Sequence, residues 1–246
     1  MTRSHARFPT YLEDQREFFD SLITEDWDSY HSAAWDRTRR AEVAEIMRVA
    51  PARRVLDIGC GCGFHDVVIA EHPDIVEVVA VDYSPRSIEV AEREYPHPNV
   101  RRAVADVFEL DRGDFDLVVS FQVIEHVSWA FEFLRACARQ ARRGGAVAVV
   151  TPNRARLDNR WRRLRGREPE LLDPQHYHEF TPSELKALAS ELPLERLATF
   201  GVGMTFTVPR FGWAAIPESI GRRAGARFPE LANGFGQIWR VLETVA

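Results

Sequence analysis

The chain has 246 residues, 45% of them hydrophobic, and a formal net charge of -5 at pH 7. This length is enough to bury one substantial core, and the acidic balance argues against a surface built mainly to hold nucleic acid. No apolar run approaches the ~20 uncharged residues that a membrane span needs, and the first residues lack a signal-peptide core. Only three cysteines are present, which is typical of reduced thiols. We therefore expect a soluble, cytoplasmic protein.

Two amphipathic helices are predicted at the start of the chain, over Tyr11–Ser21 and Arg37–Val49. Trp27, Tyr30 and Trp35 lie in or beside the connection between them. Such aromatic side chains either cover a ligand or pack into the core, and core packing is the more common use.

From about residue 53, short apolar runs alternate with helical segments, a pattern typical of βαβ units around a parallel sheet. The expected strands are Arg54–Ile58, Val76–Asp82, Val100–Ala105, Phe115–Phe121 and Ala146–Pro152. The expected helices between them are His65–Glu71, Pro85–Glu94 and Ser128–Arg143, the last ending at a pair of glycines. Right-handed crossovers would place these helices on both faces of the sheet.

The last third of the chain is expected to complete the sheet. A helix is predicted over Thr181–Glu191, because Thr181 and Glu184 have the spacing of a capping box. Two further strands are predicted over Leu194–Gly203 and Gly236–Val245. The sequence thus predicts an α/β, Rossmann-like, doubly wound and mostly parallel seven-stranded sheet with helices on both faces.

Two segments of this last third have special composition. Seven arginines lie between Arg154 and Arg167, with Asp158 as the one acid among them. They could hold a phosphate, a nucleic-acid end or an acidic lipid surface, but a solvated helix face with Trp161 docked on the body is the favoured interpretation. The apolar stretch Phe206–Ile220 could form a lid or pack in the core.

A glycine-rich loop follows the first expected strand, in the order Asp57-Ile58-Gly59-Cys60-Gly61-Cys62-Gly63. Glycines at alternate positions let the backbone turn sharply and approach a ligand at the next helix N-terminus. A dinucleotide fingerprint would place its third glycine where Phe64 stands. A carboxylate beside the loop also disfavours a pyrophosphate and suits a cationic ligand. The alternative is a tight turn without a ligand.

Acidic residues also follow the next two expected strands. Asp82 is at the tip of the second strand, where its carboxylate could accept both hydroxyls of a ribose. Asp106 follows the third strand, where it could accept from an adenine amino group or act only as a helix cap. Ligands of open α/β sheets bind at these carboxyl ends.

In this order and spacing, VLDIGCGCGFH, VAVDYSP, ADVFEL and FDLVVSFQVIEHV resemble class I S-adenosylmethionine-dependent methyltransferases. The similarity covers residues 53–153 well and the flanks more loosely. It implies that the glycine loop with Asp57 holds the methionine part, Asp82 the ribose, and Asp106 with Val107 the adenine, while Phe121 lies beside the sulfonium. The implied cofactor residues are Asp57, Gly59, Cys60, Gly61, Gly63, Asp82, Tyr83, Asp106, Val107 and Phe121.

The EHV and HxxxFT patterns are similar to those of ubiquinone-pathway O-methyltransferases, whose residues there lie by the acceptor. The matching positions are Glu125, His126 and His176, which are the candidate catalytic residues. A histidine or carboxylate can act as general base and add ~10²–10⁴-fold to the rate. A structural role, such as capping at the strand-helix junction, is the main alternative.

Some of these relatives hold a divalent metal at the same positions. This sequence has Gln122 where a further Glu is expected, and the lost carboxylate makes a Mg²⁺ site less favourable, although zinc tolerates histidines with one carboxylate. A divalent metal is therefore possible but not favoured, and no metal ligand is assigned.

The chain is expected to form one domain over residues 1–246. Its parts are N-terminal helices that cover the site (1–50), a cofactor-binding core (51–153), an insertion or lid (154–180), and a C-terminal helix with the last strands (181–246). The expected function is transfer of a methyl group from S-adenosylmethionine to a small molecule, on oxygen rather than nitrogen, with no nucleic-acid partner. The alternatives are an RNA-terminus 2′-O-methyltransferase and a non-catalytic binding module.

Overall fold

The structure is a computed structural model that describes residues 20–21, 32–173, 175–204 and 218–245. Nearly all of the expected helix Tyr11–Ser21 lies outside these residues, as do Trp27 and Tyr30. Most of the apolar stretch Phe206–Ile220 also lies outside them.

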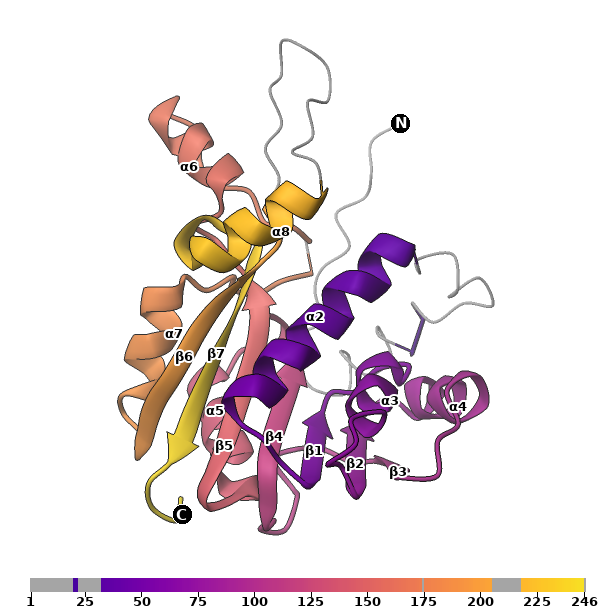
Figure 1. The fold of residues 1–246 in the computed structure, drawn as a ribbon. Helices are drawn as coiled ribbons and strands as arrows, with labels where there is room; N and C mark the ends of the chain where they lie inside the picture. The colour runs from indigo at the N-terminus through magenta and orange to yellow at the C-terminus, as the bar shows by residue number, and fades with distance from the viewer. Residues whose placement is uncertain (1–19, 22–31, 174, 205–217, 246) are drawn as a thin grey trace.

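Seven strands form one sheet in the order β3-β2-β1-β4-β5-β7-β6. Their bounds are β1 Arg54–Ile58, β2 Glu77–Asp82, β3 Val100–Val104, β4 Phe115–Phe121, β5 Ala141–Pro152, β6 Leu194–Val202 and β7 Gly234–Val241. The first five strands pair in parallel, whereas β7 is antiparallel to both β5 and β6. The predicted doubly wound, mostly parallel sheet is thus confirmed, and the carboxyl ends of β1 to β5 share one edge (Figure 1).

Helices cover both faces of the sheet (Figure 1). Their bounds are α2 Ala33–Val49, α3 Phe64–Ala70, α4 Pro85–Glu94, α5 Ala130–Gln140, α6 Leu157–Leu164, α7 Pro182–Ala189 and α8 Glu218–Arg227, with short 3₁₀ turns η2 Ile124–His126 and η3 Pro229–Leu231. None of these described helices has the length and apolarity that a membrane crossing requires.

Two apolar clusters fill the space between sheet and helices. Alternate residues of β4 divide between them: Leu117 and Val119 pack toward α2 and α3, whereas Val118 packs toward α5 and α7. This is the expected consequence of the two-residue period of a strand that is buried on both faces. Because both faces are packed, the sheet is a rigid base for the loops at its carboxyl edge.

Most element boundaries agree with the sequence, and so do two predicted helix starts. The side chain of Ser84 caps α4, which begins at Pro85. At α7, Thr181 and Glu184 form the predicted capping box. These caps satisfy backbone N–H groups that the first turn of a helix leaves without partners.

The helix predicted over Ser128–Arg143 was wrong at its end. It ends at Gln140, and β5 begins at Ala141, which pairs with Phe115 across an irregularity in β4. The pair of glycines lies within the strand rather than after the helix, and a Cβ at Gly145 would meet the carbonyl oxygen of Asp116 at 3.0 Å. Close strand approach, not helix termination, requires that glycine.

The C-terminal segment also differs from the prediction in two places. Helix α8, Glu218–Arg227, was not predicted, and its Ile220 is exposed. The last strand spans Gly234–Val241 instead of Gly236–Val245. Gly234 and Gly236 both belong to this strand and pair with β5 and β6, so glycine was a poor guide to its start.

Candidate functional site

The glycine loop after β1 has the conformation that only glycine adopts easily. Gly59, Gly61 and Gly63 have φ of 74°, 53° and 89°. A Cβ at Gly59 would meet Val123 Cγ2 at 2.4 Å, so this glycine permits contact with the loop after β4. A Cβ at Gly61 would meet nothing within 4 Å, because this glycine faces open space.

That open space is a cavity of about 400 Å³ at the carboxyl ends of β1 to β4. Nine of the ten predicted cofactor residues line it, namely Gly59, Cys60, Gly61, Gly63, Asp82, Tyr83, Asp106, Val107 and Phe121. Residues far apart in the chain therefore meet in one concave site, at the edge where open α/β sheets bind ligands.

The two acidic residues that line the cavity are already held by the backbone. Asp82 accepts the N–H groups of Gly61 and Ser84, both over 2.9 Å. Asp106 accepts the N–H of Phe108 over 2.9 Å. A carboxylate has about four acceptor sites, so each retains capacity for a ligand hydroxyl or amino group. The pKa of Asp82 is raised, mainly by burial, although its backbone hydrogen bonds partly oppose this effect.

Asp57 is the one predicted cofactor residue that does not line the cavity. Its side chain is buried below the loop, and neither carboxylate oxygen has a hydrogen-bond partner among the described residues. Burial, together with the charges of Asp66 and Asp82, raises its pKa well above the usual range. A buried acid without a partner is costly in free energy, and a cationic ligand group nearby would reduce that cost.

Among the cavity residues that were not predicted as site residues are Trp35 and Arg39 on α2, and Phe64 and His65 at the start of α3. His65 stacks on Phe121, with ring centroids 3.9 Å apart and planes 7° apart. Arg39 is held by two hydrogen bonds to the Glu42 carboxylate, of 2.9 and 3.0 Å. The expected aromatic cover over the site could have pointed to Trp35, but no sequence motif marked Arg39.

Gln122 also lines the cavity, and its φ of 57° is the one positive value of a non-glycine residue in the described part of the chain. Left-handed backbone at such a residue is uncommon and is often found at functional sites. It directs the chain from β4 into η2, whose last residue, His126, lines the cavity.

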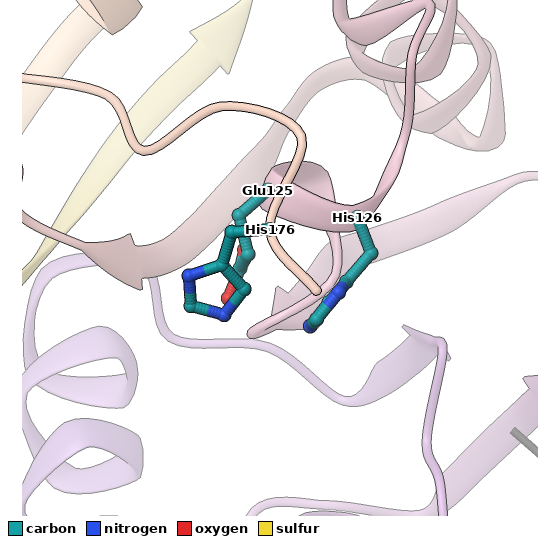
Figure 2. Close-up of side chains that lie close together, drawn as sticks. All are labelled: Glu125, His126 and His176. Carbon is teal, nitrogen blue, oxygen red and sulfur yellow. The ribbon is translucent and has the colours of Figure 1, made fainter. Parts of the chain in front are cut away.

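Figure 2 shows Glu125, His126 and His176 in one cluster. One ligand-type atom from each lies within 4.8 Å of the others, and the two histidine rings are 4.8 Å apart at 74°. His126 lines the cavity, whereas Glu125 and His176 do not. The structure thus brings the side chains of His126 and His176 into contact with each other.

Burial dominates the protonation of this cluster. It raises the pKa of Glu125 to about 7, and the Thr151 hydroxyl donates to the Glu125 carboxylate over 2.9 Å. Burial, with a smaller contribution from His176, lowers the pKa of His126 to about 4. The imidazole of His126 is therefore uncharged at neutral pH, and its burial weakens it as a proton acceptor.

Three of the seven arginines in the insertion pair with carboxylates of this chain. The pairs are Arg154 with Glu184, Arg156 with Glu179, and Arg162 with Glu170. Trp161 is partly exposed rather than docked on the body, and the Arg165 guanidinium lies 4.6 Å from its ring centre. Arg160, Arg163, Arg165 and Arg167 are exposed, as expected for the favoured solvated helix face, but the predicted docking of Trp161 on the body is wrong.

The site fits S-adenosylmethionine. Tyr83 lines the cavity, and its buried hydroxyl has no hydrogen-bond partner among the described residues. The Asp57 carboxylate also lacks one, and Gly61 leaves room for a ligand. A strand-end cavity with acidic residues and a glycine loop defines a nucleoside-binding α/β enzyme rather than a dinucleotide-binding one.

Comparison with known proteins identifies the family. A family model described as a methyltransferase domain matches residues 23–197. The chain belongs to this family and is a class I S-adenosylmethionine-dependent methyltransferase. The predicted enzyme class and cofactor are confirmed.

The relatives differ in what their names specify. One, named a probable S-adenosylmethionine-dependent methyltransferase from Mycobacterium tuberculosis, is 34% identical over 206 residues, which cover 79% of this chain and 70% of the relative. A ubiquinone biosynthesis O-methyltransferase of a Caulobacter species is 27% identical over 82% of this chain and 90% of its own length. The fold is similar to that of the N-methyltransferase NodS from Bradyrhizobium japonicum with S-adenosylhomocysteine, with a TM-score of 0.61, 14% identity, and coverage of 93% of this chain and 98% of that one.

Proposed function

We propose that this enzyme transfers the methyl group of S-adenosylmethionine to an oxygen atom of a small molecule. The observation that carries the proposal is the composition of the cavity wall. Nine predicted cofactor residues and His126 line the same cavity of about 400 Å³, so a candidate proton acceptor lies beside the cofactor site.

The proposed cofactor contacts follow the strand order. The glycine loop and the Asp57 charge hold the methionine part, Asp82 holds the ribose hydroxyls, and Asp106 with Val107 holds the adenine. Phe121, stacked on His65, lies beside the sulfonium. Bound S-adenosylmethionine supplies an activated methyl carbon, so the protein aligns the acceptor oxygen and handles its proton.

We assign the proton to His126, because it alone of the three clustered residues reaches the cavity. The acceptor hydroxyl would give its proton to the imidazole as its oxygen forms a bond to the methyl carbon, while the carbon–sulfur bond breaks and S-adenosylhomocysteine leaves. Glu125 and His176 support His126 from behind the cavity wall. The choice of oxygen as the acceptor atom is supported by the name of one relative, a ubiquinone biosynthesis O-methyltransferase.

A test compares methyl transfer to a panel of catechols, phenols, hydroxy acids, sugars and amines, with products identified by mass. The expected product has its new methyl group on oxygen, and His126→Ala is expected to reduce kcat ~10²-fold or more. His72→Ala changes a histidine outside the cavity lining and is the matched control. Methylation of amines alone, or of RNA 3′ ends alone, would overturn the proposed acceptor class.

A divalent-cation site is a second candidate role for the cluster. The observation in its favour is that three donor atoms, from two histidines and one carboxylate, lie within 4.8 Å of one another, the donor set found in zinc sites. Metal analysis of the purified protein, followed by assay after chelation, distinguishes the roles. The proton-acceptor role predicts turnover that survives chelation, whereas loss of turnover with recovery on added zinc or magnesium supports the cation site.

We also propose a cytoplasmic location. It is supported by the three cysteines, which are all buried and unpaired, as in a reducing compartment. Fractionation of cells that express the tagged protein tests it.

A further inference from the structure

A buried carboxylate lies directly behind His176. Nδ1 of His176 is 2.8 Å from Oε1 of Glu179, and Oε2 of Glu179 is 2.6 Å from Nη1 of Arg156. The Glu179 side chain is 0% exposed and the Arg156 side chain 6%. This chain of contacts runs from Arg156, the N-cap residue of α6, to the proposed catalytic cluster, and no step of the proposed mechanism uses it.

The donors around Glu179 fix which nitrogen of His176 holds the proton. The N–H of Leu172 and Nδ1 of His176 both approach Oε1, and Arg156 approaches Oε2. Nη1 of the buried Arg156 forms a salt bridge with Oε2 of Glu179 over 2.6 Å, which favours the ionised form of this carboxyl group. An ionised carboxylate only accepts, so Nδ1 must donate, and in the neutral ring the lone pair is then on Nε2.

We propose that Glu179, held in place by Arg156, is a positioning residue that keeps the proton of His176 on Nδ1 and presents Nε2 to Glu125 and His126. The proposal rests on the proposed function only in assuming that His176 supports His126 in the cluster. Carboxylates that orient a histidine in this way are common behind functional histidines, and their loss typically costs 10–100-fold in activity or affinity.

The same pair organises the insertion around the site. Arg156 also donates to the carbonyl oxygen of Glu170, and Asn159 binds both the N–H and the carbonyl of Glu170, over 2.9 and 3.0 Å. On the other side of His176, the N–H of Tyr177 donates to the Glu125 carbonyl over 2.8 Å. The segment that contains His176 is thus fixed at both ends, so the ring orientation depends on the Arg156–Glu179 pair rather than on loop position alone.

The first test needs no variant of the pair. Nitrogen NMR of the wild-type protein at pH 8, with the His176 signals assigned by their loss in His176→Asn, reports the protonation of each ring nitrogen. The expected spectrum has a protonated Nδ1 and an unprotonated Nε2. A proton on Nε2 with Nδ1 unprotonated would overturn the proposal, even if every variant of Glu179 failed to fold.

The second test is Glu179→Gln, which keeps the size of the side chain but replaces one carboxylate oxygen with an NH₂ group. This NH₂ group must face either the Arg156 guanidinium or the N–H groups of His176 and Leu172, which are also donors. We expect a changed His176 tautomer and a kcat lower by about 10–100-fold, with little change in the KM for S-adenosylmethionine. Glu184→Gln is the matched control, because Glu184 pairs with Arg154 and caps α7 without contact to His176. It should leave the tautomer and kcat unchanged.

The readouts separate this inference from the proposed function. An unchanged tautomer in folded Glu179→Gln overturns the positioning role, whatever His176→Ala does to turnover. A changed tautomer together with full turnover in His176→Ala supports the positioning of the ring and removes His176 from the proposed chemistry.

Discussion

The N–H of Gly61 donates to the carboxylate of Asp82 over 2.9 Å, and this bond joins the glycine loop after β1 to the tip of β2. The residue that is proposed to hold the ribose therefore also shapes the loop that is proposed to hold the methionine part. Replacement of Asp82 should therefore weaken cofactor binding in two ways, by loss of the ribose contact and by a change in the glycine loop.

Asp82→Asn tests this coupling. The amide cannot accept both N–H groups and two ribose hydroxyls, so affinity for S-adenosylhomocysteine should fall about 10–100-fold, as expected for lost hydrogen bonds to a charged group. Isothermal calorimetry measures it. Asp116→Asn is the matched control, because Asp116 also accepts two backbone N–H groups, from Arg53 and Arg54, but lies at the opposite edge of the sheet. Equal affinity losses in the two variants would contradict a role in binding.

Gly61→Ala tests the open space above the loop. The left-handed backbone should cost about 1–2 kcal/mol of stability, and the added methyl group should weaken S-adenosylhomocysteine binding about tenfold or more. Gly166→Ala is matched to it, because Gly166 also has a positive φ of +67° and no neighbour within 4 Å of a Cβ, but does not line the cavity. Thermal melts should show similar losses for both variants. If Gly61→Ala binds the ligand as tightly as wild type, the loop does not contact it.

Gly59→Ala tests the contact between the loop and the segment after β4. The new Cβ would overlap Val123 Cγ2, so both the positive φ and the overlap destabilise the protein. Val123→Ala in the same chain removes the overlap, so the double variant should be less destabilised than the sum of the two single variants, measured by urea unfolding. Losses that simply add would show that the backbone strain accounts for the whole effect of Gly59→Ala.

Asp57→Asn should stabilise the ligand-free protein. Burial raises the pKa of Asp57 in the folded state above that in the unfolded state. Above the usual carboxyl pKa the unfolded chain loses this proton, whereas folding still requires the acid to be protonated. The free energy of unfolding therefore decreases as the pH rises from the unfolded pKa to the folded pKa. Removal of the charge should increase Tm by about 2–4 °C at pH 7, for a gain of ~1 kcal/mol, and by less at pH 4. Melts at both pH values measure this.

Two results would argue against this account of Asp57. An equal gain at pH 4 and pH 7 would mean that the charge is not the cause. Unchanged affinity for S-adenosylhomocysteine in Asp57→Asn would separate the buried acid from the methionine part of the cofactor.

The cofactor half of the site could be predicted because its signals are local. Gly59, Gly61 and Gly63 are set by backbone conformation, and Asp82 and Asp106 by their place after a strand, so each can be recognised within a few residues of sequence. The parallel sheet then brings them together without further information. Asp57 shows the limit, because its burial below the loop depends on packing that no motif describes.

The rest of the cavity wall and the cluster of Glu125, His126 and His176 were harder to predict because they depend on tertiary contacts. Arg39 and His65 reach the cavity through the packing of α2 and α3 against the sheet, and their spacing in sequence resembles that of any surface helix. The contact between His126 and His176 depends on the insertion, whose path is fixed by the buried Arg156. In sequence, Arg156 looked like one member of a surface arginine cluster.

A crystal structure with S-adenosylhomocysteine bound tests the central claim most directly. The account predicts that the Asp82 carboxylate accepts both ribose hydroxyls, and that the sulfur lies beside Phe121 on the side of the cavity lined by His126. A ribose bound away from Asp82, or a sulfur directed away from His126, would contradict it.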